Sequence, residues 1–432
     1  MTAPVTAGLR PRRRTSSAVR LLWLGQSLSL LGDRVTVLAL PLAALAVGAS
    51  VSQVAVLVGA TSAPFLLLGL PAGVWVGRIG LRRSMLVADV MRAAALASLP
   101  AGALLGTVSY VQLLIVALLV GCASVLFQVA YQSLTPLLVN NADELRSANT
   151  RLTTSEAVSL TVGPAGAGLL IGAVGAVRAL AFDAASFVFS AGTLVLLKAP
   201  ADLPASKKLP MYAEIRAGVR YMLGSPPLRA VLWSSVLFNI GQAGYEALIV
   251  VFAVQRLGLS PTTLGLAIGI GGVGVPLGML VSGPVQRRLG VGPVLIGSGG
   301  LSGAGLLVVS LAPTGRLAAD VIVTGAFISA VGGGAWGLTA LTTRQTLSPL
   351  DMRAMVTAVF RWATYGVVPL GAVAAGLAAT VLGVRPALIV AGVVAQLCVV
   401  PLLLPSVRKL RSLTMASAGP AEFSEDMDNT EC

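Results

Sequence analysis

The chain has 432 residues, of which 56% are hydrophobic and only 11% are charged, and its mean hydropathy is +0.89. Soluble domains carry about 25% charged residues, so this composition excludes an ordinary water-soluble fold and predicts a membrane protein. The net charge of +14 does not indicate nucleic-acid binding, because the basic residues are neither gathered on a soluble segment nor interleaved with stacking aromatic residues.

Apolar segments long enough to cross a bilayer follow one another from about residue 19 to residue 405. We expect an all-α membrane protein with twelve transmembrane helices in two six-helix, pseudo-symmetric bundles. The first six helices are expected at about 19–47, 52–77, 84–106, 108–138, 147–174 and 178–197. The second six are expected at about 229–256, 262–286, 292–312, 318–346, 353–381 and 386–404.

A segment rich in proline and lysine separates the two halves. Within it, Met211, Ile215, Val219 and Met222 fall on one helical stripe, which predicts a short amphipathic helix lying on the membrane surface. The predicted organisation is a basic amino-terminal segment at 1–18, bundles at 19–198 and 229–405, a linker at 199–228, and a disordered tail at 406–432.

The two halves also repeat each other in sequence. The hexapeptide Gln-Ser-Leu-Thr-Pro-Leu at 132–137 returns as Gln-Thr-Leu-Ser-Pro-Leu at 345–350, a separation of 213 residues. A glycine- and arginine-containing stretch at 73–80 is echoed at 283–290, a separation of 210 residues. Echoes in the same order at nearly the same spacing indicate two tandem copies of one half.

Basic residues concentrate in alternate links, as in the link that holds Arg78, Arg82 and Arg83, whereas the intervening links carry few. This asymmetry follows the positive-inside rule and places both termini and the central linker in the cytoplasm. We therefore expect a multi-pass protein of the cytoplasmic (inner) membrane.

The chain lacks residues that several kinds of chemistry require. None of the lysines follows a glycine, so the phosphate-binding loop of an ATP-driven pump is missing, and the chain contains no histidine for a His-ligated metal or a Ser-His triad. No nucleophile, base and orienting group occur together near a link. We expect no enzyme activity, no cofactor and no metal.

Few acids lie at membrane depth, where a charge is kept only if it faces a cavity or a partner. Asp33 lies about 21 Å along the first helix and is the leading candidate for a proton-coupling residue. Glu156 and Glu246 are further candidates, either for the proton or for binding a cationic substrate. A structural ion pair is the alternative for Asp33, and an ion pair or an interface position is the alternative for Glu156 and Glu246. Asp183 and Asp320 are expected near the outer helix ends, within reach of water.

Polar and aromatic residues inside the apolar runs are candidates to line a central substrate cavity, although packing roles are the alternative. They are Gln26, Gln128, Tyr131, Asn239, Gln242, Tyr245, Trp336 and Tyr365. Arg344 and Arg361 are expected to stay near the cytoplasmic helix ends and extend toward water.

Pro164, next to Gly163, and Pro369 occupy matching places in the two copies and should kink the fifth and eleventh helices. The 49 glycines permit close helix approach and sliding between the halves, and static packing is the alternative.

The link after the second helix resembles the cytoplasmic signature of the major facilitator superfamily in its twelve-helix form. The matching positions are Gly73, Gly77, Arg78, Gly80, Arg82 and Arg83. Gly77 departs from the pattern, since the family usually has an acid there that locks the cytoplasmic side. The resemblance implies a cytoplasmic gate, to which Asp89 and Arg92 would contribute in place of the missing acid.

Residues 159–168 resemble the signature of proton-coupled antiporters in the fifth helix, with Ala167 interrupting the final pair of glycines. The phrases at 127–128, 131–132, 148–149 and 183–187 are similar to the bacterial branch that includes the enterobactin exporter and macrolide efflux proteins. This resemblance implies an exporter of an amphiphilic drug or secondary metabolite, driven by proton antiport. We also expect a monomer and a role in antibiotic resistance.

Two alternatives remain open from the sequence. A siderophore exporter or a nutrient importer could use the same fold, because direction is not fixed by architecture. A receptor or assembly subunit without transport activity is an alternative of another class, favoured by the loss of the acid at Gly77.

Overall fold

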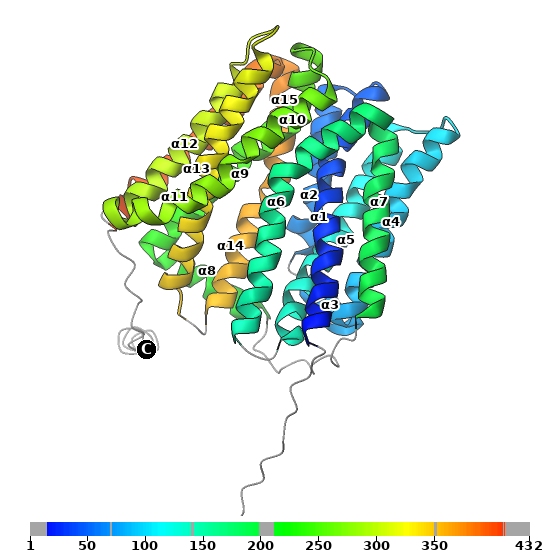
Figure 1. Cartoon of the computed structure of the whole chain (residues 1–432). Coiled ribbons are helices and arrows are strands. Elements are labelled where there is room, and N and C mark those ends of the chain that lie inside the picture. The colour runs from blue at the N-terminus through cyan, green and yellow to red at the C-terminus, as the bar shows by residue number, and fades with distance from the viewer. Residues whose placement is uncertain are drawn as a thin grey trace, which may run out of the picture.

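Figure 1 shows the computed structural model, which describes residues 15–69, 71–139, 142–197, 211–349, 352–408 and 410. Throughout these ranges the regular structure is helical, and twelve helices are long and apolar enough to cross a membrane. The predicted fold class is therefore confirmed. Of the predicted amino-terminal segment 1–18 and tail 406–432, residues 1–14, 409 and 411–432 lie outside the described part of the chain, as do the linker residues 198–210. The tail prediction is wrong at its start, because Pro405–Arg408 is helical and Val407 is buried.

The first half contains six spans. They are α1 (Thr15–Ala46), α2 (Val51–Leu68) continued by α3 (Ala72–Ile79), α4 (Leu81–Leu104), α5 (Tyr110–Leu134) continued by η1 (Thr135–Leu138), α6 (Ala142–Val174) and α7 (Ala176–Leu196).

The second half repeats this plan after a short connecting helix, α8 (Met211–Gly224). Its elements are α9 (Pro226–Val251) with η2 (Phe252–Arg256), α10 (Pro261–Gly272) with α11 (Gly274–Leu289), α12 (Val291–Ser310), α13 (Ala318–Leu347), α14 (Arg353–Gly366) with α15 (Val368–Leu382), and α16 (Val384–Gln396) followed by the short α17 (Val399–Leu402) and α18 (Pro405–Arg408).

Backbone geometry carries the signature of the tandem repeat. In the described ranges, the residues with positive φ are glycines at the links between spans, and they pair between the halves. The pairs are Gly48 with Gly258, Gly80 with Gly290, Gly106 with Gly315, and Gly175 with Gly383, at separations of 210, 210, 209 and 208 residues. Because glycine adopts this conformation without a steric cost, the matching placement shows that the two halves turn at corresponding points.

The two matching prolines have different effects on their helices. Pro369 lies in the first turn of α15, and the helix is interrupted at Val367, between α14 and α15. Pro164 lies inside α6, which continues through it from Ala142 to Val174. A proline lacks the backbone donor of a helical hydrogen bond, so an interruption is expected just before it. The eleventh span shows this interruption.

The connecting helix α8 has the expected amphipathic character in the side chains that the structure describes. Met222 is buried and Val219 is partly buried, in a cluster that includes Val356 of α14. Arg216 and Arg220 are exposed on the other side of the helix. The side chains of the first turn, at 211–215, lie outside the description.

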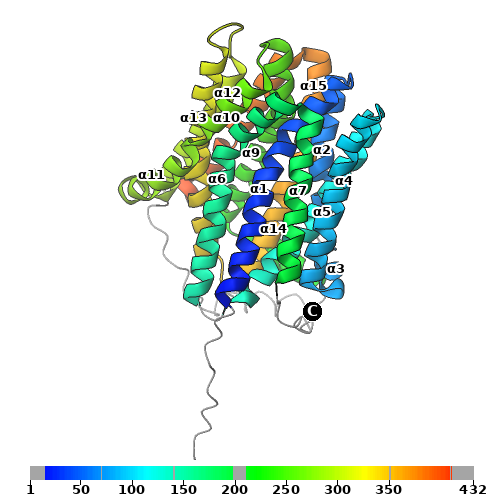
Figure 2. The ribbon, with the colours of Figure 1, turned by 45° about the vertical axis from the view of Figure 1, so that its right-hand side comes forward.

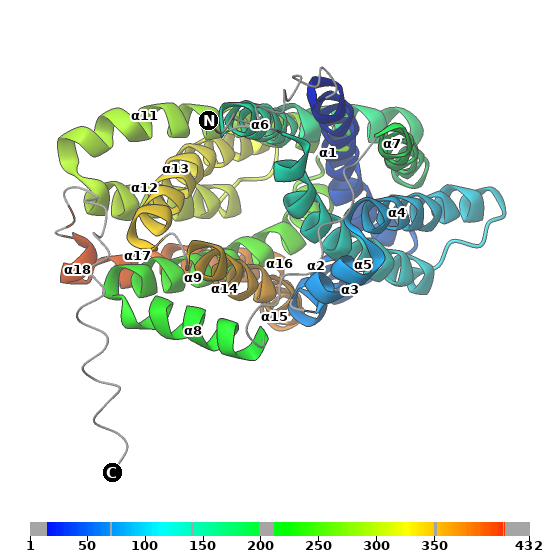
Figure 3. The same cartoon turned by 90° about the horizontal axis from the view of Figure 1, so that it is seen from below.

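The halves lie side by side, as the view in Figure 3 shows, and they meet through α6 against α10 and α2 against α15. We call the face at which α1 begins the near face and the opposite one the far face. Figures 1 and 2 both show α10 crossing beside the upper part of α6. There the backbones approach so closely that a Cβ atom on Gly168 would lie 2.8 Å from the Gly265 Cα. The far-face side is thus held closed by glycine contacts.

This contact predicts that alanine substitutions at two neighbouring glycines will affect stability differently. In Gly168→Ala the new methyl group would press on α10, and overpacking of this kind costs about 1–3 kcal/mol. In Gly166→Ala the methyl group would meet nothing within 4 Å, so the better helix propensity of alanine should leave stability unchanged or slightly raised. Thermal unfolding of the purified variants measures both. Equal melting temperatures for the two would contradict the described contact.

Candidate functional site

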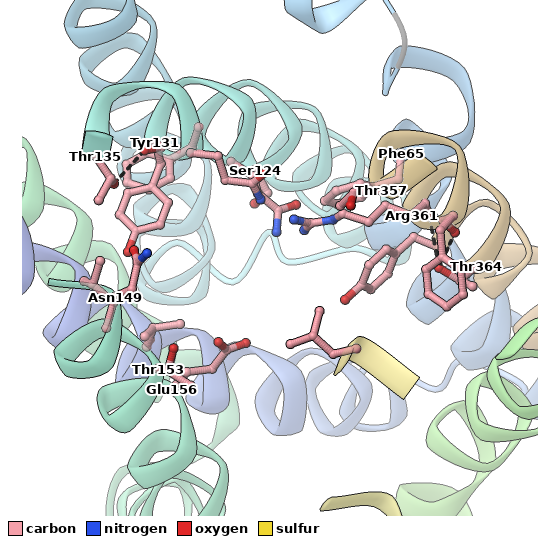
Figure 4. Close-up of a pocket in the computed structure, with 18 of the residues that line it drawn as sticks. Phe65, Ser124, Tyr131, Thr135, Asn149, Thr153, Glu156, Thr357, Arg361 and Thr364 are labelled. Atoms are coloured by element: carbon pink, nitrogen blue, oxygen red, sulfur yellow. Dashed lines mark hydrogen bonds between the residues drawn. The ribbon is translucent and has the colours of Figure 1, made fainter. Parts of the chain in front are cut away.

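A cavity of about 830 Å³ lies between the two halves. Its walls come mainly from α1, α5 and α6 in the first half and from α9, α13 and α14 in the second, with residues in the middle or near-face part of each helix. Figure 4 shows the open space, with Glu156 and Thr153 on one wall and Arg361 and Thr364 on the other. Cavities of this size accommodate drug-sized ligands.

Most of the residues expected from the sequence line this cavity. The lining includes the acids Asp33 and Glu156, and the polar and aromatic residues Gln26, Gln128, Tyr131, Asn239, Trp336 and Tyr365. These residues come from helices far apart in the chain, and the fold brings them together. In the sequence, their one shared feature was a polar or aromatic side chain within an apolar run.

Three expected residues of α9 lie beyond the cavity. Gln242, Tyr245 and Glu246 are absent from its lining, because they follow Asn239 by one to two turns toward the far face. Tyr245 is buried in the core, and the Gln242 Nε2 donates a hydrogen bond of 2.9 Å to Glu246 Oε1. These three residues therefore belong to the closed side of the molecule.

Arg34 connects the first half to this closed side. Its guanidinium group lies within electrostatic range of the Glu246 carboxylate. Gly163 of α6 leaves the room that the aliphatic part of Arg34 occupies, since a Cβ at Gly163 would overlap the Arg34 side chain. The glycine beside the fifth-span proline thus provides space for an arginine.

The inner end of the cavity holds an ion pair. Arg92 donates to Asp89 Oδ1, and the two side chains are 5% and 0% exposed. The Arg92 guanidinium also lies 4.5 Å from the ring centroid of Phe127 and 4.0 Å from that of Phe187. Asp33 lies within electrostatic range of this arginine. The pair therefore lies inside the first bundle, away from the surface link with which it had been grouped.

The link with the family signature lies at the near face. Arg82 donates hydrogen bonds of 2.7 and 2.6 Å to the carbonyls of Leu194 and Val195, which ties α4 to the end of α7. A cation is favourable there because a helix ends in unpaired carbonyls. The neighbouring arginines, Arg78 and Arg83, are exposed.

The glycines of this link differ in what surrounds them. Gly80 has φ of +94°, which marks the turn between α3 and α4. Gly73 and Gly77 are exposed, and a Cβ atom added at either would meet nothing within 4 Å. The position where the family usually has an acid is therefore open space on the near face.

Asp183 corrects a sequence-based expectation. It is fully buried rather than reached by water, with its Oδ2 accepting from Thr36 and its Oδ1 accepting from Ser186 at 3.0 Å. Counting residues from the helix end had suggested exposure. Gly32 lets α7 approach α1 closely at this point, since a Cβ there would overlap the Asp183 carboxylate. Asp320, by contrast, is exposed.

Arg344 and Arg361 correct a second expectation. Both line the cavity instead of extending toward water at the helix ends. The Arg344 guanidinium stacks over the Phe360 ring at 4.2 Å from its centroid, and that of Arg361 lies 5.6 Å from the Tyr365 centroid. The sequence held one signal for this. Both arginines lie inside apolar runs, within about one helical turn of an aromatic or polar residue.

The profile of the transmembrane secretion effector family matches residues 6–430. The chain belongs to this family. It is also 26% identical over 405 residues to the uncharacterized MFS-type transporter YfiS of Bacillus subtilis (strain 168), an alignment that covers 89% of this chain and 92% of that protein. Membership of a major facilitator type family identifies the molecule as a multi-pass membrane transporter.

Solved structures share the fold of this chain at low sequence identity. A mutant form of the nucleoside transporter NupG superposes with a TM-score of 0.72 at 11% identity, covering 89% of this chain and 98% of that one. A bacterial homologue of the iron transporter ferroportin, in an inward-facing state, gives a TM-score of 0.66 at 18% identity, covering 89% and 98%.

The buried ion pair predicts a non-additive pair of substitutions. Arg92→Gln leaves Asp89 buried without its counter-charge, and breaking such a pair costs about 3–5 kcal/mol. The double variant Asp89→Asn with Arg92→Gln removes both charges and should recover part of that loss. Melting temperatures of the purified single and double variants test this. A double variant no more stable than Arg92→Gln alone would contradict the pairing.

Proposed function

We propose that this protein exports an amphiphilic drug or secondary metabolite by proton antiport with alternating access. The observation that carries the proposal is the shape of the cavity, which is sealed toward the far face by helix contacts and has an acid, Asp33, at its inner end. A cavity closed on one side supports a transport cycle in which the halves rock to expose the same site alternately.

The charge asymmetry of the links supports an orientation in the membrane. The near face carries the arginines of the link at 78–83 and the exposed arginines of α8. By the positive-inside rule this face would be cytoplasmic, and the cavity in this state would then be open to substrate from the cytoplasm. The family description, a secretion effector, agrees with export.

Proton coupling is assigned to Asp33, with Glu156 as a second titratable group on the same cavity. A charge in this environment is costly unless it has a partner. The arginines within electrostatic range of Asp33 are Arg92, which is already paired with Asp89, and Arg34, which also lies within range of Glu246. Asp33 would therefore exchange its proton with whichever side the cavity faces, and one proton crossing 100 mV supplies about 2.3 kcal/mol. Glu246, near Arg34, would take part in proton transfer on the far-face side.

Removing the Asp33 carboxylate tests the coupling. In energised everted vesicles, wild-type protein should release protons on addition of at least one compound from a panel of amphiphilic drugs, and Asp33→Asn should lower that signal at least tenfold. Asp320→Asn, which removes an exposed acid, should behave as wild type. Undiminished proton release in Asp33→Asn would refute the assignment, and silence of the wild type across the panel would refute antiport.

Orientation can be tested separately by cysteine labelling in a background without Cys122, Cys398 and Cys432. A cysteine at Arg83, exposed in the first turn of α4 on the near face and outside the cavity lining, should react with a membrane-impermeant maleimide in everted vesicles and not in right-side-out ones. A cysteine at Thr314, in the exposed far-face link between α12 and α13, should show the reverse. The opposite pattern would place the near face outside the cell.

A further inference from the structure

The two walls of the cavity carry different charges. The first half contributes both acids of the lining, Asp33 and Glu156, together with Arg92, which is neutralised by Asp89. The second half contributes Arg344 and Arg361 and, among the residues that the structure describes, no acid. The cavity is therefore acidic on one side and basic on the other.

The two arginines have no counter-charge in the described ranges. The ion pair beside the cavity joins Asp89 to Arg92, on the other wall. Arg344 is 9% exposed and its Nε has no hydrogen-bond partner. It also lies within electrostatic range of Arg361, so two like charges face the same space. Unpaired buried cations are costly, and an anion between them would remove that cost.

Aromatic and donor groups surround the arginines. The rings of Phe360 and Tyr365 hold the two guanidinium planes by cation–π contacts, which fixes their direction without using their hydrogen-bond donors. Trp336, on the same wall, has a buried Nε1 without a partner. This wall therefore offers two guanidinium groups and apolar surface, whereas the Trp336 Nε1 is buried beside Gly299 of α12.

We propose that this basic wall binds an anionic group of the substrate, such as a carboxylate, between Arg344 and Arg361. The inference rests on the proposed function, because it names the chemical class of the compound that the exporter takes. The substrate is then an amphiphilic organic anion, or a zwitterion whose cationic end faces Glu156. Guanidinium groups recognise carboxylates through paired hydrogen bonds, which provides orientation as well as charge.

Matched fluorescent probes test the proposal. Dansyl-leucine carries a carboxylate, and dansyl-leucinamide has the same body without the charge. Their affinities are compared by fluorescence titration of the purified protein in nanodiscs, with empty nanodiscs as the blank. The carboxylate should bind at least tenfold more tightly than the amide, a difference of about 1.4 kcal/mol.

Substitutions locate the preference. Arg344→Gln and Arg361→Gln should each reduce the preference for the carboxylate to less than threefold, and Arg361→Lys should retain part of it because the charge remains. Arg353→Gln removes a charge from the same helix α14 at a position outside the cavity lining, so it should keep the wild-type preference.

Three results would overturn the proposal. The first is equal affinity of the wild type for the two probes, and the second is no binding of either probe. The third is an equal loss of affinity for both probes in the glutamine variants. The titration uses no proton gradient, so its outcome is separate from that of antiport. A protein that prefers the carboxylate and fails to release protons would retain this site and lose the proposed coupling.

Discussion

A bilayer offers no partner to a polar or charged group, and this constraint accounts for where the chain places its few charges. The Asp89 and Arg92 pair and the hydrogen-bonded Asp183 are buried between helices of the first bundle. Arg34 and Glu246 lie within electrostatic range of each other toward the closed side. Four further charges, Asp33, Glu156, Arg344 and Arg361, line the large space between the halves. Structural charges are thus paired, whereas these four face the cavity, where a ligand or a proton can reach them.

The two halves approach each other closely through glycines. Glycines let α6 meet α10 and α2 meet α15 at backbone distance, and these contacts close the far-face side. Such contacts depend on shape alone, because helices in lipid gain little from hydrophobic association. The proposed rocking cycle would have to release these contacts and form similar ones on the near-face side. Paired positive-φ glycines at the links give both halves the same turning points.

Much of this arrangement could be predicted from the sequence. The twelve spans, the helix in the link and the interruption before Pro369 follow from apolar length, one amphipathic stripe and the chemistry of proline. The orientation of single charges could not be predicted in this way. Residue counting gives the depth of Asp183, but its burial depends on Gly32 of another helix. Likewise, the direction of Arg344 is set by the Phe360 ring, which lies 16 residues later, on α14.

The central claim is that the cavity between the halves opens alternately to the two faces. Double electron–electron resonance measures it directly, with one spin-label pair at Arg151 and Ala358 on the near-face side and another at Val111 and Thr314 on the far-face side, all exposed positions. Lowering the pH should shorten the first distance and lengthen the second in the same sample. Distances that stay fixed in both pairs, or that change together in one direction, would contradict alternating access.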